Sequence, residues 1–192
     1  MSGRPRRDPA AGPPGGPEPA AARAAPAAPA AEVDVRPLRE ADLDALVELY
    51  AAVAAEGRWI GAEAPVDRER RRQRFAEQLH SDSTVMLVAD AGGQLVGQLG
   101  LHVAGYGVAD LGMLVAEGWR RRGVGSALLR EGIDRARQAG AHKVALQVWP
   151  HNRAAIALYE RFGFRHEGRL RRHYRRRSGE LWDAIVMGLP LD

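Results

Sequence analysis

A short turn rich in arginine and glycine carries the residue types that most clearly indicate binding chemistry. Residues 120–126 read Arg-Arg-Arg-Gly-Val-Gly-Ser and join an apolar run, residues 111–115, to a long amphipathic segment. Gly123 and Gly125 have no Cβ, so the backbone can turn sharply there and come close to a ligand. The first N–H groups of the following helix lack an intrahelical acceptor, and the positive helix end favours an anion. The turn therefore predicts a site for a phosphate group.

Two well-known phosphate-binding patterns do not fit this turn. The dinucleotide pattern G-x-G-x-x-G needs a third glycine where the chain has Leu128, and the Walker pattern needs a Gly-Lys-Ser/Thr sequence that does not follow. The pattern that remains is R-x-x-G-x-G. On its own it is weak, because only three of its positions are specified.

A second motif lies downstream of the turn. Residues 152–164 follow a strand-like run and read N-x-x-A-x-x-L-Y-x-x-x-G-F. In this order and at this separation, the two motifs resemble those of the GCN5-related N-acetyltransferase (GNAT) superfamily. The resemblance extends from Val33 to the C-terminus. The sequences of residues 109–112 and 167–169 look most similar to those of bacterial members that acetylate free amino acids, small amines or the N-termini of ribosomal proteins.

The resemblance also implies how a cofactor is held. In such acetyltransferases the strand before the turn separates from the strand ahead of the last helix, and the pantetheine arm of acetyl-CoA lies in that cleft. The amine then attacks the thioester directly, which agrees with a chain that has no cysteine. The residues expected to bind acetyl-CoA are Met113, Leu114, Val115, Arg120, Arg121, Arg122, Gly123, Val124, Gly125, Ser126 and Asn152. Asn152 also stands where a helix N-cap belongs, and both roles can hold.

Two side chains are expected to move protons. Tyr159 is the candidate acid for the departing thiolate, because a phenol is an adequate acid and the resemblance places the acid in this Leu-Tyr pair. Tyr159 also belongs to an apolar stripe at helical spacing, so a core tyrosine is the alternative interpretation. Asp110 is the first candidate for the base, directly or through a water, and a carboxylate that pairs with an arginine is its alternative. The further candidates for the base are Glu117, His102, His151 and bulk water.

One position departs from the pattern of the ribosomal-protein alanine acetyltransferases. Those proteins have a glutamate on the strand before the last helix, where this chain has Gln147. An amide cannot accept the proton, so this choice of substrate is weakened. The expected acceptor is a primary amine, which leaves open an amino acid, a small amine or a protein N-terminus.

The composition excludes several other kinds of chemistry. The chain has 192 residues, of which 45% are hydrophobic, and no cysteine. A chain of this length and hydrophobic content is expected to form one core. The absence of cysteine excludes disulfides, thiolate nucleophiles and cysteine metal sites. No metal is expected. No apolar run reaches the length of a membrane span, and the N-terminus lacks the apolar stretch of a signal peptide. We therefore expect a cytoplasmic protein without a membrane partner, and a homodimer stays open.

The elements that must position these residues can be read along the chain. Residues 1–31 consist mostly of alanine, proline and glycine and are expected to be a disordered tail, whereas residues 32–192 are expected to form the acetyltransferase domain. The predicted fold is α/β, with a mixed, mostly antiparallel sheet of six to seven strands, about four helices and a splayed strand pair that forms the acetyl-CoA cleft. The predicted strands are residues 33–36, 84–89, 95–103, 108–115, 144–148, 164–172 and 181–189. The predicted helices are residues 42–55, 67–79, 124–138 and 152–162.

Two arginine-rich segments remain to be explained. The run at residues 68–74 is expected to be a solvated helix face. The cluster at residues 169–177 could bind a substrate carboxylate, the 3′-phosphate of the cofactor or an acidic macromolecule, although most of its arginines are expected to be solvated. Besides a catalytic acetyltransferase, two functions stay open: a non-catalytic acyl-CoA sensor, and an RNA- or ribosome-associated protein, for which no RNA-binding motif is present.

Overall fold

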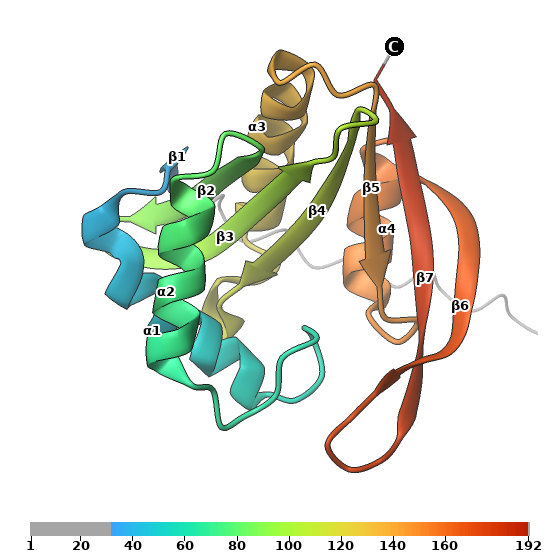
Figure 1. Ribbon diagram of the computed structural model, residues 1–192, viewed down its shortest axis with the longest axis horizontal. Coiled ribbons are helices and arrows are strands. Elements are labelled where there is room, and N and C mark those ends of the chain that lie inside the picture. The colour runs from blue at the N-terminus through green and yellow to red at the C-terminus, as the bar shows by residue number, and fades with distance from the viewer. Residues whose placement is uncertain (1–31, 192) are drawn as a thin grey trace, which may run out of the picture.

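The computed structural model describes residues 32–191, and the predicted tail at residues 1–31 lies outside this part of the chain (Figure 1). The predicted helices and strands are present, with ends that differ by at most three residues. In chain order the elements are β1 (Asp34–Pro37), η1 (Glu40–Asp42), α1 (Leu43–Ala55), α2 (Arg68–Leu79), β2 (Thr84–Ala91), β3 (Gln94–Val103), β4 (Val108–Val115), η2 (Glu117–Trp119), α3 (Val124–Gln138), β5 (Lys143–Val148), α4 (Arg153–Arg161), β6 (Arg165–Arg175) and β7 (Leu181–Pro190).

The strands form one seven-stranded sheet in the order β1-β2-β3-β4-β5-β7-β6. Every neighbouring pair is antiparallel except β4 and β5, which run parallel. This parallel pair needs a long crossover, and α3 supplies it. The predicted fold class, a mixed and mostly antiparallel sheet with four helices, is confirmed.

Helices cover the two faces of the sheet unequally. α3 and α4 lie against one face, and α1 and α2 lie against the other over β2, β3 and β4 (Figure 1). Among residues 32–191, no helix lies over β5, β7 and β6 on the α1–α2 side, so the described residues leave that part of the sheet open. Strands β2 and β3 are covered on both faces, which explains why they read as nearly continuous apolar runs.

Each face has its own core. On the α3 side, Leu99, Leu128 and Leu129 are fully buried, and on the α1–α2 side Leu46 and Val88 are. α3 can approach β3 closely because Gly132 faces Leu99: a Cβ on this glycine would lie 2.9 Å from the leucine side chain. The close fit fixes α3, and with it the turn at its N-terminus, against the sheet.

The parallel strands β4 and β5 pair only over their first halves. The register runs from Val108 opposite Lys143 to Leu111 opposite Leu146 and then stops. β4 continues beside β3 to Val115, while β5 continues beside β7 to its own end, so the two strands diverge (Figure 1). This is the splayed pair that the resemblance implied, and it opens toward the turn before α3.

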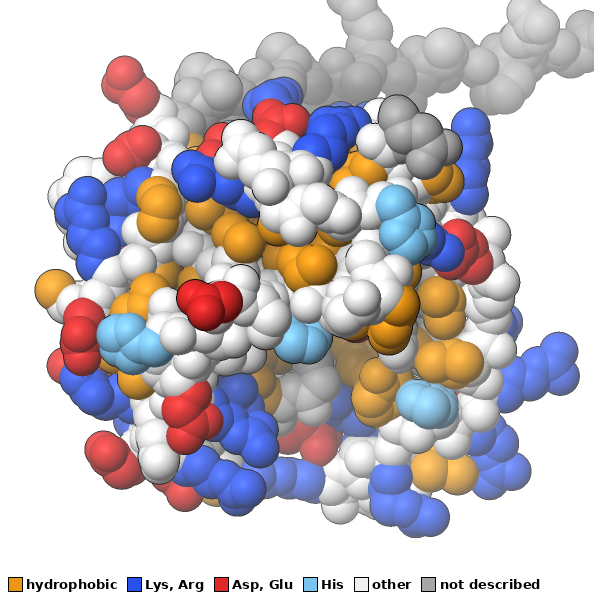
Figure 2. All heavy atoms as spheres, turned by 45° about the horizontal axis from the view of Figure 1, so that its top comes forward, with side chains coloured by type: hydrophobic (Ala, Val, Ile, Leu, Met, Phe, Trp, Pro, Cys, Tyr) orange, Lys and Arg blue, Asp and Glu red, His pale blue; other side chains and the backbone are white. Residues whose placement is uncertain are grey.

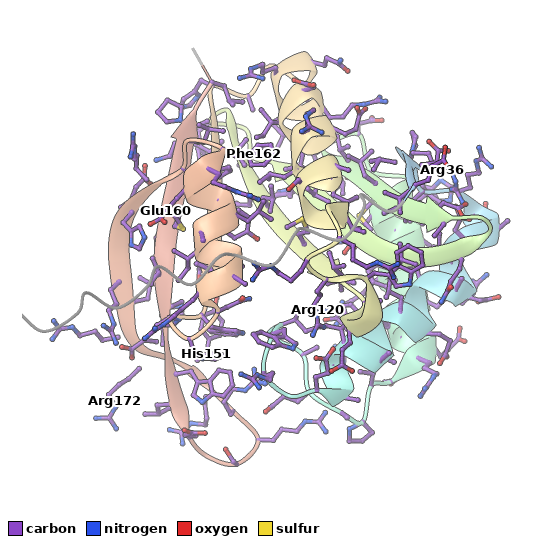
Figure 3. All side chains as sticks on the ribbon, turned by 180° about the vertical axis from the view of Figure 1, so that it is seen from behind. Arg36, Arg120, His151, Glu160, Phe162 and Arg172 are labelled. Atoms are coloured by element: carbon purple, nitrogen blue, oxygen red, sulfur yellow. The ribbon has the colours of Figure 1, made fainter. Side chains whose placement is uncertain are left out.

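The last hairpin extends further than predicted. β6 was expected to end at residue 172 but continues to Arg175, with an irregular register between Leu170 and Tyr174. At this bulge Arg172 adopts a positive φ of 50°, and its N–H donates to Asp183 Oδ1 at 2.6 Å. Figure 3 shows Arg172 extending away from the sheet. Such a bulge leaves little trace in the sequence, because the ladder resumes beyond it.

Candidate active site

The turn before α3 presents a row of backbone donors. Gly123 is the N-cap of α3 with a φ of 87°, and Arg121 also has a positive φ, of 62°. Within the described residues, the N–H groups of residues 121–126 donate to no acceptor. Successive donors in this type of conformation form a concave nest that suits an anion. This geometry suits a phosphate group, and the phosphate site itself stays a prediction.

The three arginines of the turn have different surroundings. Arg120 is bound inside the protein: Nη1 donates to Glu56 Oε2 at 2.7 Å, and Nε donates to the Val115 carbonyl at 3.0 Å. Arg122 lies over the Trp119 ring at 4.8 Å. Arg121 is exposed and makes no ion pair with any described residue. The side chain of Arg120 was predicted to bind the cofactor; in the structure it ties the turn to the end of α1 instead (Figure 3).

The diverging half of β4 offers backbone groups to the cleft. Ala116 N donates to Val96 O on β3, and alternate residues of a strand point their backbone groups to opposite sides. The groups of Met113 and Val115 therefore point away from β3, toward β5. Those of Leu114 point to β3, and its side chain is buried in the α1–α2 core. Of the three residues predicted here, Met113 and Val115 face the cleft and Leu114 does not.

α4 begins with a cap and carries the predicted acid. Asn152 Oδ1 accepts from Ala155 N at 3.2 Å, so this side chain caps the helix. Tyr159 is only 6% exposed and packs beside Phe164 with 5.6 Å between ring centroids. Burial raises the pKa of the Tyr159 hydroxyl to about 12. The phenol therefore keeps its proton across the physiological pH range.

α3 and α4 meet where the turn ends. A Cβ on Gly125 would lie 3.1 Å from Leu158 Cδ2 and 3.7 Å from Met113 Cε. The glycine thus lets the start of α3, the side of α4 and the diverging half of β4 come together. A larger side chain at this position would press against Leu158 and Met113.

The predicted base lies on the other face of the sheet. Asp110 and Gln147 line an open hollow of about 350 Å³ on the α1–α2 side, together with Leu111, Ala145, Leu146, Tyr174 and Val186. The Tyr174 hydroxyl donates to Gln147 Oε1 at 2.6 Å. Asp110 forms no ion pair within residues 32–191, so the arginine partner considered from the sequence is not seen there. Its cross-strand neighbour on β3 is His102, another candidate for the base.

The two predicted catalytic side chains are therefore not neighbours. Tyr159 packs with the core on the α3–α4 side, whereas Asp110 opens on the α1–α2 side. Asp110 lies in the half of β4 that pairs with β5, opposite Ala145 and just before the two strands diverge. Of the remaining candidates, Glu117 is exposed in η2, and His151 Nε2 lies 2.8 Å from the Arg58 carbonyl.

A clamp of three side chains, Glu63, Arg176 and Arg177, was missed from the sequence. Arg176 is only 4% exposed; its Nε lies 3.0 Å from Glu63 Oε1, and its guanidinium also donates to backbone carbonyls of the α1–α2 loop. Arg177 donates to the carbonyls of Ala64 and Pro65 at 2.7 and 3.1 Å. The clamp joins the tip of the β6–β7 hairpin to the α1–α2 loop.

Most arginines of the cluster at residues 169–177 are exposed, as expected, but Arg176 is buried. Buried charges need partners, and the partners come from a loop more than 100 residues away in the chain. The only local hint was the aromatic residues nearby: Arg176 lies 4.3 Å over the Trp182 ring, which packs edge-on against Trp149. Trp149 in turn packs against Tyr174, which lines the hollow beside Asp110.

Comparison with known proteins places this geometry in a family. Residues 45–164 match the model of the Acetyltransferase (GNAT) family. An L-amino acid N-acetyltransferase of Escherichia coli is 30% identical over 161 residues, which cover 81% of this chain and 96% of the relative. An L-methionine sulfoximine/L-methionine sulfone acetyltransferase of Pseudomonas aeruginosa is 27% identical over 163 residues, 82% of this chain and 94% of the relative.

Solved structures agree with the sequence relatives. A ribosomal-protein-alanine N-acetyltransferase from Brucella melitensis has a TM-score of 0.75 at 30% identity, over 82% of this chain and 99% of that one. The yncA protein of Salmonella typhimurium, solved with its cofactor acetyl-CoA, has a TM-score of 0.74 at 24% identity, over 84% and 95%. The chain belongs to the GNAT acetyltransferase family. No helix in residues 32–191 is long and apolar enough to cross a membrane.

Proposed function

We propose that the protein transfers the acetyl group of acetyl-CoA to the primary amine of a free amino acid or another small amine. The observation that carries this proposal is the row of unpaired backbone donors at the start of α3, which opens onto the gap between β4 and β5. Two relatives are acetyltransferases of amino acids or their analogues, which supports this class of acceptor.

The residues around the gap suit acetyl-CoA. The N–H groups of residues 121–126 and the exposed Arg121 match a pyrophosphate in charge and hydrogen-bonding type. The backbone groups of Met113 and Val115 match the amides of a pantetheine arm, although the Val115 carbonyl already accepts from Arg120. When bound, acetyl-CoA supplies the thioester that reacts with the amine.

Two protons must move during this reaction. The amine nitrogen bonds to the acetyl carbon, the carbon–sulfur bond breaks, and the thiolate needs a proton. Tyr159 holds one, because its pKa is raised to about 12 by burial. Asp110, on the opposite face, is the group that would accept the proton of the ammonium, through a water. Acid and base on opposite faces suit a thioester that lies between them in the gap.

The hollow beside Asp110 suits a small acceptor. It holds one carboxylate and one amide, so it can attract an ammonium group without binding it permanently. Gln147 lines the hollow, and its side chain accepts a hydrogen bond from Tyr174. A glutamate here would suit the ribosomal-protein acceptor, and its replacement by an amide favours the amino acid over the protein N-terminus.

A panel of acceptors tests the proposal. Purified protein would be incubated with acetyl-CoA and, in turn, with amino acids including methionine sulfone, polyamines, aminoglycosides and short peptides. Thiol release and the mass of the product would be measured. We expect an N-acetylated amino acid or small amine formed in equal amount to CoA. Tight acetyl-CoA binding without any product would instead indicate the sensor, and preference for peptides would indicate a protein acceptor.

An RNA-binding role has less support. On the face shown in Figure 2, arginine and lysine side chains lie at separate places among acidic ones rather than in one continuous patch. Steep salt-dependent RNA binding would be the contrary result. We further propose that residues 32–192 form the catalytic domain and that the protein acts in the cytoplasm, where acetyl-CoA is available to it.

A further inference from the structure

A second hollow, of about 370 Å³, lies apart from the gap and from Asp110. It is open to solvent and lined by the first turns of α2, the α1–α2 loop, Tyr50 of α1 and the tip of the β6–β7 hairpin. Four arginines line it: Arg70, Arg71 and Arg74 from α2, and Arg177 from the hairpin tip. It shares no lining residue with the hollow beside Asp110.

The acidic residues of this hollow are already engaged. Glu63 Oε1 lies 3.0 Å from the buried Arg176, and its Oε2 accepts from Arg177 N at 2.8 Å. Asp67 Oδ1 caps α2 by accepting from Arg70 N at 3.0 Å. The four guanidinium groups therefore face a hollow whose two carboxylates already have partners.

The arginines of α2 are divided between two sides. Arg68 pairs with Glu48 at 2.6 Å and Arg72 pairs with Asp44 at 2.7 Å, both on α1. Arg70, Arg71 and Arg74 line the hollow, and none of them has a carboxylate partner within residues 32–191. α2 therefore presents Arg70 and Arg74, which are exposed, and the half-buried Arg71 to the hollow.

Two of the guanidinium groups are held in place before any ligand arrives. Arg71 lies over the Tyr50 ring at 4.1 Å, and Tyr50 also lines the hollow. Arg177 is held by the carbonyls of Ala64 and Pro65. A guanidinium has five N–H donors, so each keeps donors for a ligand. Groups fixed on opposite elements lose less freedom when they bind.

We propose that this hollow binds a small oxyanion with at least two negative charges, through phosphate or carboxylate groups. Guanidinium groups bind such oxygens with paired, charge-assisted hydrogen bonds, and four of them exceed what one charge needs. The hollow shares no lining residue with the one beside Asp110, and the proposal does not depend on the proposed function. Because Arg177 and Glu63 belong to both the hollow and the clamp, a bound anion adds contacts to the clamp.

Calorimetry with the full-length protein tests the site. Inorganic pyrophosphate and citrate would be titrated separately at low ionic strength, with CoA at saturation to fill the turn before α3. We expect Arg74→Gln to weaken binding of the better anion about tenfold, the effect of one lost charge-assisted hydrogen bond. Arg72→Gln, two residues away on the same helix but paired with Asp44, is the matched control and should leave the affinity unchanged.

The two anions distinguish a phosphate ligand from a carboxylate ligand. Binding of pyrophosphate alone assigns a phosphate ligand, and binding of citrate alone assigns a carboxylate ligand. Equal loss in the Arg74 and Arg72 variants, or no saturable binding of either anion, would overturn the proposal. Since the comparison is between two α2 variants, this outcome is independent of whether acetyl transfer is observed.

Discussion

The two sides of the proposed active site are built from different parts of the chain. On the cofactor side, the donors are backbone N–H groups of six consecutive residues, 121–126, held in position by the packing of α3. On the acceptor side, the clamp joins side chains at residues 176 and 177 to a loop at residues 57–65. The first arrangement is local and needs glycine; the second is long-range and needs particular side chains. We therefore expect substitutions on the two sides to alter different kinetic constants.

The largest effect is expected at Tyr159 on α4. Tyr159→Phe removes the hydroxyl and keeps the ring that packs on Phe164, so the fold should be stable. If the phenol protonates the thiolate, kcat should fall by about 10²- to 10⁴-fold when chemistry limits the rate, with the affinity for acetyl-CoA unchanged. Steady-state kinetics and calorimetry would measure both. Because burial raises the pKa of Tyr159 to about 12, the wild-type rate should show no loss of this acid at ordinary alkaline pH. Parental turnover in the variant would make Tyr159 a core residue only.

A smaller and more selective effect is expected at the clamp. Arg176→Lys keeps the positive charge but cannot reach Glu63 and the loop carbonyls with one planar group. We expect the KM for the acceptor to rise about tenfold. The reason is that Trp182, Trp149 and Tyr174, which connect Arg176 to the hollow beside Asp110, lose their fixed position. The affinity for acetyl-CoA should not change. Arg175→Lys, at an exposed neighbouring position, is the control. An equal change in both constants would show that the two sides are not separable.

A modest, pH-dependent effect is expected where the turn is tied to α1. Hydrogen bonds from Arg120 hold the pKa of Glu56 below its ordinary value of 4.5. A carboxylate with a lowered pKa in the folded state stabilises the protein above its unfolded-state pKa, and this stability is lost as the pH falls through the folded-state pKa. Glu56→Gln should therefore lower the Tm by a few degrees at pH 7, and the difference should shrink below about pH 4.5. Thermal melts across pH 3–8 would measure it. A difference that grows in acid would contradict this account.

The smallest effect is expected from the N-terminal segment. Deletion of residues 1–31, which consist mostly of alanine, proline and glycine, should leave the Tm and turnover nearly unchanged. Differential scanning calorimetry and the acetylation assay would compare the truncated and full-length proteins. A clear fall in Tm would show that this segment packs on the domain and contributes to one of the two sides.

The same contrast explains how far the sequence could be interpreted. Gly123 and Gly125 could be recognised from the sequence because a site made of backbone groups requires particular residue types at consecutive positions. The strand and the helix predicted on either side of them are both present. Arg176 could not, because nothing in its neighbourhood shows that carbonyls at residues 57, 60 and 61 surround it. The same holds for Arg120, although it belongs to a recognisable motif. Its side chain binds Glu56, which lies 64 residues earlier in the chain. Long-range partners of charged side chains are set by the fold, and the sequence does not display them.

The measurement that tests the account most directly is calorimetric titration of acetyl-CoA into three proteins: wild type, Gly125→Val and Gly118→Ala. A valine at position 125 would fill the space beside Leu158 and Met113, whereas a Cβ at Gly118 would meet open space. We predict saturable binding of one acetyl-CoA per chain to the wild type, unchanged affinity in Gly118→Ala and a loss of about tenfold or more in Gly125→Val, with similar Tm values. Absence of binding to the wild type, or unchanged affinity in Gly125→Val, would contradict the assignment of this turn and gap to acetyl-CoA.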